Sequence, residues 1–110
     1  MSLVLSFETE ELQAICENEL EAKQKLSVAV AKALQTRLAD LVSAVTVNDL
    51  LAGNPTPFID SDSQPAFGVD LDDGYKLIFC SAHVTTRYLN NGSVDWSKTK
   101  RIKILRIDKQ

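Results

Sequence analysis

The chain has 110 residues, of which 45% are hydrophobic and 25% charged, and this balance is that of an ordinary folded domain. We expect a single domain over residues 1–110 without a membrane-spanning segment, because the sequence contains no run of roughly 18 apolar residues. The net charge of −3 argues against a generic nucleic-acid binder, and the N-terminus lacks the pattern of a secretory signal.

Charge is unevenly distributed along the chain. Residues 1–50 carry eight acidic and four basic side chains, and residues 51–75 carry five acidic side chains and no basic one. Residues 76–110 carry eight basic and two acidic side chains, a net charge of +6. A basic segment of this kind attracts phosphates or an acidic protein partner, although a solvated charged face would have the same composition.

The first half of the sequence predicts a strand followed by two helices. Residues 4–7 are a short apolar run typical of a strand, and Thr9 is a candidate helix N-cap ahead of two glutamates. A second amphipathic helix is predicted from about residue 26 to residue 41. Four apolar side chains with helical spacing predict the first helix, over about residues 10–22: Leu12, Ile15, Cys16 and Leu20.

The middle of the chain predicts a connection and then a β-hairpin. Residues 48–53 predict one capped turn that ends at Gly53, and the proline-rich and acidic residues 55–65 predict a surface loop. Residues 67–71 alternate with period two, Asp72-Asp73-Gly74 is a strong hairpin-turn signal, and residues 75–80 form the return strand. Alternation in this return strand places two sets of side chains on opposite faces: Tyr75, Leu77 and Phe79 on one, Lys76, Ile78 and Cys80 on the other.

The last third predicts a polar excursion and a final strand. Residues 83–100 are polar, and within them Trp96 is expected to anchor the segment to the core rather than to stack on a base. Residues 101–107 are apolar on both faces near their middle, which is typical of a central strand. The whole pattern predicts an α+β domain of order β-α-α-β-β-β, with the helices on one face of a small, mainly antiparallel sheet.

Most catalytic motifs are missing from the sequence. There is no phosphate loop, dinucleotide fingerprint or metal-ligand spacing, and we expect neither a metal nor a cofactor. His83 has no nucleophile or carboxylate in a recognisable motif, and Asp72-Asp73 is best explained as turn chemistry. Cys16 and Cys80 are expected to be reduced, buried thiols of a cytoplasmic protein.

Two cations lie in strands that otherwise predict buried positions. Lys76 is the sole charge in residues 75–80, and strict alternation places Arg106 on the same face as Ile104. A buried cation costs stability unless its head group reaches water or an anion. Either both side chains extend to the edge of the sheet, or they converge in a phosphate-binding concavity that Arg87 reaches from its loop.

The order of these segments resembles the RelE/HigB-type toxins, the "plasmid maintenance system killer protein" family of type II toxin–antitoxin systems. The hairpin over residues 69–79 is the most specific part, and the two helices, residues 92–98 and the last strand also match. The resemblance implies a RelE/ParE-like fold and an antitoxin partner, which we expect to be a helix-turn-helix protein. Many relatives inhibit translation by cleaving mRNA on the ribosome. The resemblance therefore also implies that this chain is a metal-independent endoribonuclease.

The resemblance carries Lys76 and Asp108 over by position. Relatives commonly have arginine where this chain has Lys76, and they often end in Asp-Tyr-His where this chain ends in Asp108-Lys109-Gln110. Three groups are therefore candidates for the base in RNA cleavage. They are Tyr88, Asp108, and a lysine whose pKa is lowered by neighbouring positive charge.

The sequence thus provides two sets of candidate residues. The candidate catalytic set is Lys76, Arg87, Arg106 and Asp108, and the candidate RNA-binding set is Lys98, Lys100, Arg101, Lys103 and Tyr88. The alternative hypothesis is a non-catalytic binder on the same fold, which is either a gyrase-type inhibitor or a decayed toxin that retains antitoxin binding.

Overall fold

A computed structural model of the chain describes residues 3–50, 53–60, 64–82, 89–90 and 94–109. The helical elements of this part are α1 (Glu10–Glu17), α2 (Glu19–Lys25) and α3 (Val28–Ser43), with the short 3-10 helices η1 (Val47–Asp49) and η3 (Trp96–Lys98). The strands are β1 (Val4–Phe7), β2 (Thr56–Ile59), β3 (Pro65–Asp70), β4 (Tyr75–Ser81) and β5 (Arg101–Lys109).

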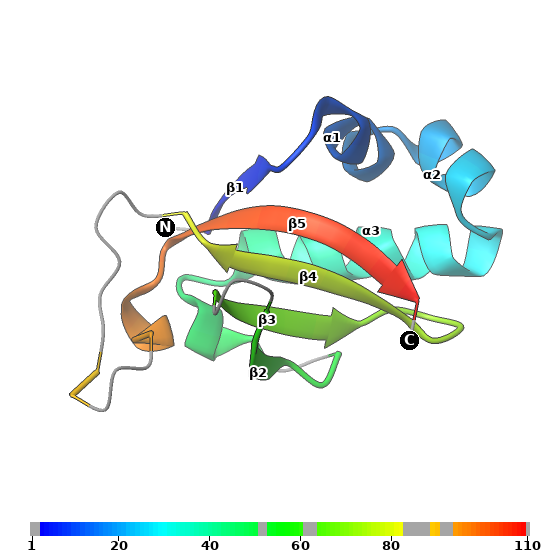
Figure 1. The fold of residues 1–110 in the computed structure, drawn as a ribbon. Helices are drawn as coiled ribbons and strands as arrows, with labels where there is room; N and C mark the ends of the chain where they lie inside the picture. The colour runs from blue at the N-terminus through cyan, green and yellow to red at the C-terminus, as the bar shows by residue number, and fades with distance from the viewer. Residues whose placement is uncertain (1–2, 51–52, 61–63, 83–88, 91–93, 110) are drawn as a thin grey trace.

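The five strands form one sheet in the order β1-β5-β4-β3-β2. β1 pairs with β5 in parallel, and the other three pairings are antiparallel. In Figure 1, α3 lies behind the sheet, and α1 and α2 lie on the side of β5 that faces away from β4. The α+β class, the mainly antiparallel sheet and the central position of the last strand are confirmed. No helix among the described residues is long and apolar enough to cross a membrane.

The predicted first helix is two helices. Asn18 interrupts it, because its Oδ1 accepts hydrogen bonds from the backbone N–H groups of Leu20 and Glu21 and so starts α2. The break changes the direction of the chain, and Leu20 is 70% exposed instead of buried with Leu12 and Cys16. The prediction of one helix over residues 10–22 was therefore wrong, because a side-chain cap competed with the apolar periodicity.

The segment between the helices and the hairpin also differs from its prediction. The turn after α3 is the 3-10 helix η1, which ends before Gly53. Thr46 and Asp49 cap it, because the backbone N–H of Thr46 donates to the Asp49 carboxylate. The predicted surface loop contains β2, which pairs with β3 along the outer edge of the sheet. An edge strand tolerates the missing N–H of Pro57, so the proline-rich composition did not exclude a strand there.

The β3–β4 hairpin turns where the sequence predicts. Asp73 and Gly74 have φ angles of 54° and 78°, and the N–H of Tyr75 donates to the carbonyl of Asp72 at 3.0 Å. Two consecutive positive φ angles define the tight turn that matches the twist of a hairpin. The register then pairs Val69 with Leu77, so that both side chains lie on one face of the sheet.

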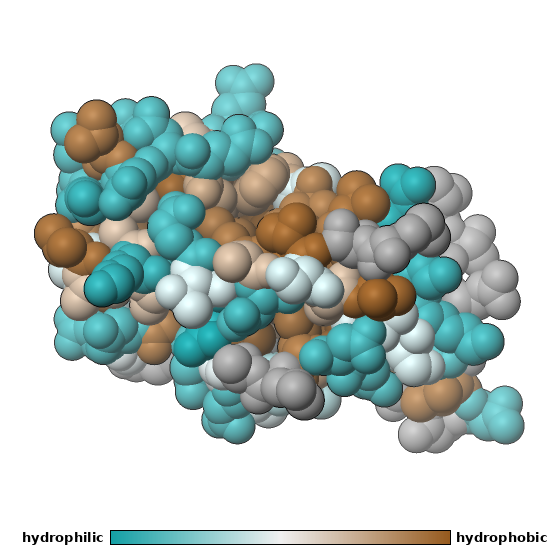
Figure 2. Space-filling model, turned by 180° about the vertical axis from the view of Figure 1, so that it is seen from behind, coloured by the Kyte–Doolittle hydropathy of each residue, from teal (hydrophilic) through white to brown (hydrophobic). Residues whose placement is uncertain are grey.

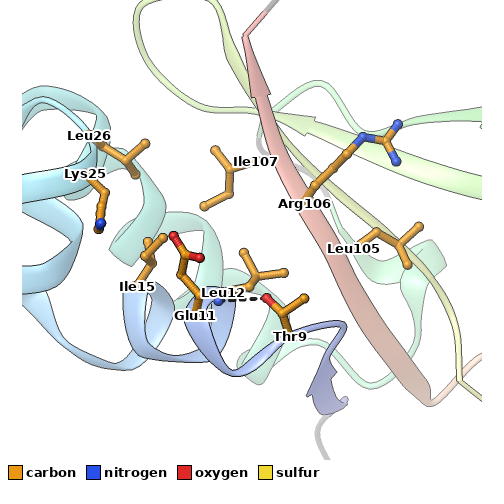
Figure 3. A pocket seen from close by; sticks show the side chains of 9 residues that line it. All are labelled: Thr9, Glu11, Leu12, Ile15, Lys25, Leu26, Leu105, Arg106 and Ile107. Atoms are coloured by element: carbon orange, nitrogen blue, oxygen red, sulfur yellow. Dashed lines mark hydrogen bonds between the residues drawn. The ribbon is translucent and has the colours of Figure 1, made fainter.

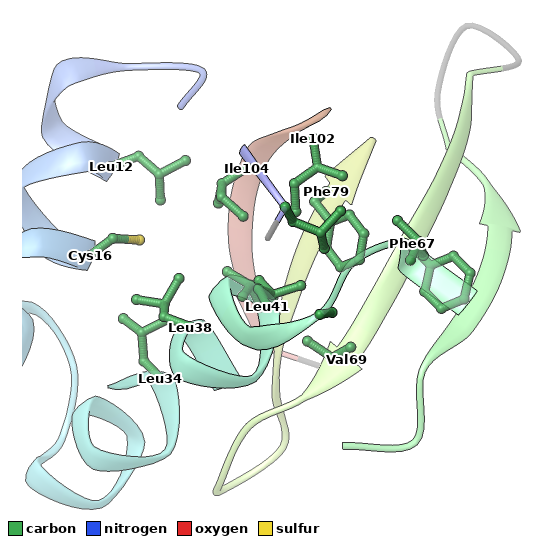
Figure 4. Close-up of a cluster of buried hydrophobic side chains, with 14 of the residues drawn as sticks. Leu12, Cys16, Leu34, Leu38, Leu41, Phe67, Val69, Phe79, Ile102 and Ile104 are labelled. Atoms are coloured by element: carbon green, nitrogen blue, oxygen red, sulfur yellow. The ribbon is translucent and has the colours of Figure 1, made fainter. Parts of the chain in front are cut away.

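The core lies between the sheet and the helices (Figure 4). Its fully buried side chains come from α3 and the central strands and include Leu34, Leu41, Leu77, Phe79, Ile102 and Ile104. Trp96 packs edge-on against Phe67 with ring centroids 5.1 Å apart, as expected for an anchor. Cys16 and Cys80 are buried free thiols, as predicted.

The outer surface of the helix side is partly apolar (Figure 2). Leu20 of α2 and Val28 of α3 are 70% and 64% exposed. Hydrophilic side chains, in teal, lie beside the hydrophobic ones, in brown, on the face that Figure 2 shows. Lys76, Lys103, Arg106 and Asp108, four of the charged residues singled out from the sequence, lie instead on the strands.

Candidate anion-binding site on the open sheet face

A β-bulge decides which side chains share the sheet face opposite α3, here called the open face. β4 and β5 pair as Phe79 with Ile104 and Ile78 with Arg106, so Leu105 is an extra residue in β5. The extra residue inverts the alternation beyond it, and Arg106 lies on the opposite face from Ile104. The prediction that Arg106 shares the apolar face with Ile104 was wrong, because strict alternation does not allow for a bulge.

The bulge brings the candidate residues of two strands together. Lys76 on β4 pairs in register with Asp108 on β5, and Arg106 lies two positions before Asp108. A hollow of about 200 Å³ on the open face is lined by Thr56, Phe58, Gly68, Lys76, Ile78, Arg106 and Asp108. Sequence reasoning found three of these residues, and it missed those of β2 because it placed no strand there.

Gly68 keeps the hollow open. A Cβ atom at this position would lie 3.4 Å from Cδ1 of Ile78 and 3.6 Å from the ring of Phe58. A side chain there would occupy the space between β2 and β4. The charged groups of β4 and β5 therefore face a shallow depression that an exposed aromatic ring borders.

Arg106 is held by two carboxylates. Its Nη1 and Nη2 each donate to one oxygen of Asp60, both at 2.7 Å, and its Nε donates to Asp108. The hydrogen bond to Asp60, and to a smaller degree that to Asp108, raises the pKa of Arg106. Burial lowers this pKa, but by less than the hydrogen bonds raise it. The guanidinium is therefore a permanent cation, and each of its three nitrogens already donates to a carboxylate.

Lys76 is also paired within the chain. Its Nζ lies 3.2 Å from a carboxylate oxygen of Asp70, which is its register partner on β3. The lysine side chain is 30% exposed, so its head group reaches both water and a carboxylate. Lys76 and Arg106 thus line one hollow, whereas a phosphate-binding concavity that Arg87 also reaches stays a prediction.

The other basic candidates that the structure describes lie outside the hollow. Lys103 on β5 pairs with Glu8 at 2.9 Å, and this hydrogen bond raises the pKa of Lys103, so this lysine is a poor candidate base. Lys98 ends η3, and Lys100 and Arg101 are exposed at the start of β5. The structure brings together Lys76, Arg106 and Asp108, and the candidates Arg87 and Tyr88, like His83, lie outside the described residues.

The charge asymmetry of the sequence is largely cancelled in space. The basic side chains of Lys76, Lys103 and Arg106 belong to the last third of the chain, and each pairs with an acid from residues 1–75. Unpaired basic charge attracts phosphate strongly, but a cation with a carboxylate partner attracts it less. The open face is therefore an anion-binding constellation that the chain has already filled with its own acids.

A second hollow lies on the other side of β5 (Figure 3). It has a volume of about 390 Å³ between β5 and the helices α1 and α2. Its walls are mainly apolar, with Leu12, Ile15 and Leu26 facing Ile107. Arg106 points away from this groove, as the bulge requires (Figure 3). Glu11 of α1 and Lys25 of α2 also line the groove.

The chain matches no family model, no curated protein and no solved structure. Among the described residues, no group of three or more His, Cys, Asp or Glu side chains could hold a metal ion.

Proposed function

We propose that this chain is the toxin of a type II toxin–antitoxin pair, with a RelE/ParE-like fold. In this proposal it is cytoplasmic and inhibits translation by metal-independent cleavage of mRNA on the ribosome. One observation carries the proposal: two cations and a carboxylate, Lys76, Arg106 and Asp108, line one hollow on adjacent strands. The order of strand, helices, hairpin and final strand also supports it.

The chemistry requires a base, a cation and a proton donor. The RNA 2′-hydroxyl gives its proton to the base and attacks the adjacent phosphorus to form a 2′,3′-cyclic phosphate, and the bond to the 5′ oxygen breaks as that oxygen takes a proton from water. Asp108 is the base candidate that lies within the hollow, and Arg106 holds it through Nε. Lys76 and Arg106 stabilise the charge that develops on the phosphate oxygens. Phe58, at the rim, offers a ring on which a base can stack.

One observation favours the alternative, a non-catalytic binder of the same fold. Both cations of the hollow already have carboxylate partners, Asp70 for Lys76 and Asp60 for Arg106. A decayed toxin that retains only antitoxin binding, or a gyrase-type inhibitor, does not need these cations to meet a phosphate.

Induction of the chain without a partner separates the candidates. In the host, incorporation of labelled methionine should stop within minutes, and incorporation of labelled thymidine should fall only later. The mRNA should show new 5′ ends within translated codons by primer extension. An early block of thymidine incorporation with intact mRNA would instead support gyrase inhibition, and no change in either process would support a decayed toxin.

The antitoxin is tested separately. Co-expression with the product of the adjacent reading frame should give a stable complex, because opposite charge speeds encounter and apolar burial holds the pair. The exposed residues Lys98, Lys100 and Arg101 are the basic side chains to which an acidic partner would be steered. If a well-folded neighbouring protein does not bind the chain in a pull-down, the toxin proposal fails.

A further inference from the structure

The guanidinium of Arg106 holds a carboxylate in the arrangement with which it would hold a phosphate. Its two terminal nitrogens each donate at 2.7 Å to a different oxygen of Asp60, which is 46 residues away in sequence. A planar, two-point contact of this kind is also how arginine binds two phosphate oxygens. We propose that Asp60 is an internal competitor for the phosphate site, so that an RNA phosphate binds Arg106 only by displacing the Asp60 carboxylate.

The position of Asp60 suits this role. It follows the edge strand β2, and its backbone N–H donates to the carbonyl of Gln64 at 2.7 Å, which extends the β2–β3 pairing. Its side chain is only 11% exposed, whereas that of Arg106 is 39% exposed. The carboxylate is thus directed inward from an edge strand onto a guanidinium that remains accessible to solvent.

The charges around the hollow make Asp60 the controlling group. Lys76 and Arg106 provide two positive charges, and Asp60, Asp70 and Asp108 provide three negative ones. Removal of one carboxylate charge makes the group neutral, and removal at Asp60 also exposes both terminal nitrogens of Arg106. A phosphate would then meet an open guanidinium fork instead of an anion.

The other ion pairs of the open face do not share these features. Asp70 and Glu8 each contact a lysine through one oxygen, and their side chains are 43% and 47% exposed. Single, exposed contacts of this kind are worth little and exchange readily with solvent. Asp60 is distinguished from them by its burial and by its use of both oxygens.

The inference rests on the proposed function, because it assumes that the hollow takes RNA phosphate. It is tested by fluorescence anisotropy with a short, fluorescein-labelled single-stranded RNA. Asp60→Asn should bind this RNA at least about tenfold more tightly than the wild-type chain. The log–log dependence of affinity on salt should steepen by about 0.7, as expected for one additional neutralised phosphate.

Glu19→Gln is the matched control. It removes the same charge from α2, where Glu19 pairs with Lys23 at 3.1 Å. Because exposed charges further apart than the Debye length of about 8 Å are screened at physiological salt, its affinity should stay within about twofold of wild type. Asp60→Asn combined with Arg106→Gln should lose the gain in affinity, since the gain requires the guanidinium.

The outcomes separate the inference from the proposed function. If the wild-type chain binds RNA and Asp60→Asn binds no better than Glu19→Gln, the competition is overturned while the proposed function stands. If none of the variants binds RNA or cleaves mRNA on ribosomes, both fail. Should Asp60→Asn not fold, the wild-type chain provides the test: added RNA must shift the guanidinium ¹⁵N resonances of Arg106, and unchanged resonances on binding would overturn the competition.

Discussion

The two faces of the sheet are built by different rules. On the helix-covered face, Leu77, Phe79 and Ile104 are 0% exposed and pack against α3. On the open face, Lys76 and Arg106 are 30% and 39% exposed, and they form ion pairs with Asp70 of the same hairpin and with Asp60, which is 46 residues from Arg106. Apolar burial therefore holds the first face. On the second face Ile78 and Cys80 are buried as well, but the exposed pairs add little stability. Changes to the helix-covered face should therefore affect folding, and changes to the charged residues of the open face should affect binding.

The largest expected effect follows from insertion of one alanine between Ile78 and Phe79 of β4, opposite Leu105, the extra residue of the bulge. With a residue to pair with, Leu105 would enter the regular alternation, and Lys76, Arg106 and Asp108 would turn toward the core and Ile107 toward the open face. Because buried charges without partners cost about 3–5 kcal/mol each, the insertion should lower the free energy of unfolding by at least about 5 kcal/mol. Urea denaturation provides the measurement.

Leu105→Ala is the control for the insertion, since it keeps the lengths of β4 and β5. It should cost no more than about 1–2 kcal/mol, because Leu105 is only partly buried. Equal losses in the insertion variant and in Leu105→Ala would show that the bulge does not fix the two faces.

The next effect compares two phenylalanines. Phe79→Ala on the helix-covered face should destabilise the fold by about 3–5 kcal/mol, because it leaves a cavity under a side chain with no exposed surface. Phe58→Ala on the edge strand should cost about 1 kcal/mol, since Phe58 is already 36% exposed. Thermal or urea unfolding of both variants is the measurement, and a larger loss in Phe58→Ala would contradict the assignment of the core.

The third effect depends on pH. Burial, and to a smaller degree Glu17, raises the pKa of the Cys16 thiol from 9.0 to about 11. Because the unfolded chain ionises first, this contribution to stability is complete below pH 9 and is lost as the pH rises from about 9 to about 11. The loss should reach at most about 2.7 kcal/mol, the equivalent of two pKa units.

Cys16→Ala isolates this contribution. The variant should lose less stability than the wild-type chain between the same two pH values, when urea unfolding is measured at each. The difference between the two chains is the relevant quantity, since groups such as Lys103, whose pKa is also raised, titrate in both. Parallel losses in both chains would mean that Cys16 does not titrate in the folded state.

The smallest expected effect on free energy concerns Lys76. Lys76→Met should lower mRNA cleavage on ribosomes at least tenfold, equivalent to about 1.4 kcal/mol in the transition state. The melting temperature should hold or rise, because an apolar side chain suits the strand. Lys76→Arg should retain or improve activity, since a guanidinium binds phosphate through two donors.

Lys23→Met on α2 is the matched control for Lys76→Met. It removes the same charge from an exposed ion pair with Glu19, away from the open face. Cleavage should be unaffected by this control, as measured by primer extension beside a melting curve. If Lys76→Met leaves cleavage unchanged, Lys76 is not part of the site and its pairing with Asp70 is only structural.

Local patterns predicted a large part of the fold. The period of two over residues 67–80 and the Asp73-Gly74 turn were sufficient for the β3–β4 hairpin, because both depend on neighbouring residues. The apolar middle of β5 likewise indicated its central position in the sheet. The break at Asn18 and the strand β2 were missed, since a capping side chain and an edge pairing depend on particular contacts rather than on periodicity.

The sequence by itself determined that Lys76 and Arg106 are cations in apolar strands, and that basic charge gathers in the last third. The tertiary structure decided what these charges meet. The bulge at Leu105 turned Arg106 to the open face, and pairing with Asp60 used its terminal donors. The physical reason is that periodicity is local, whereas a bulge depends on the partner strand and an ion pair joins residues far apart in sequence.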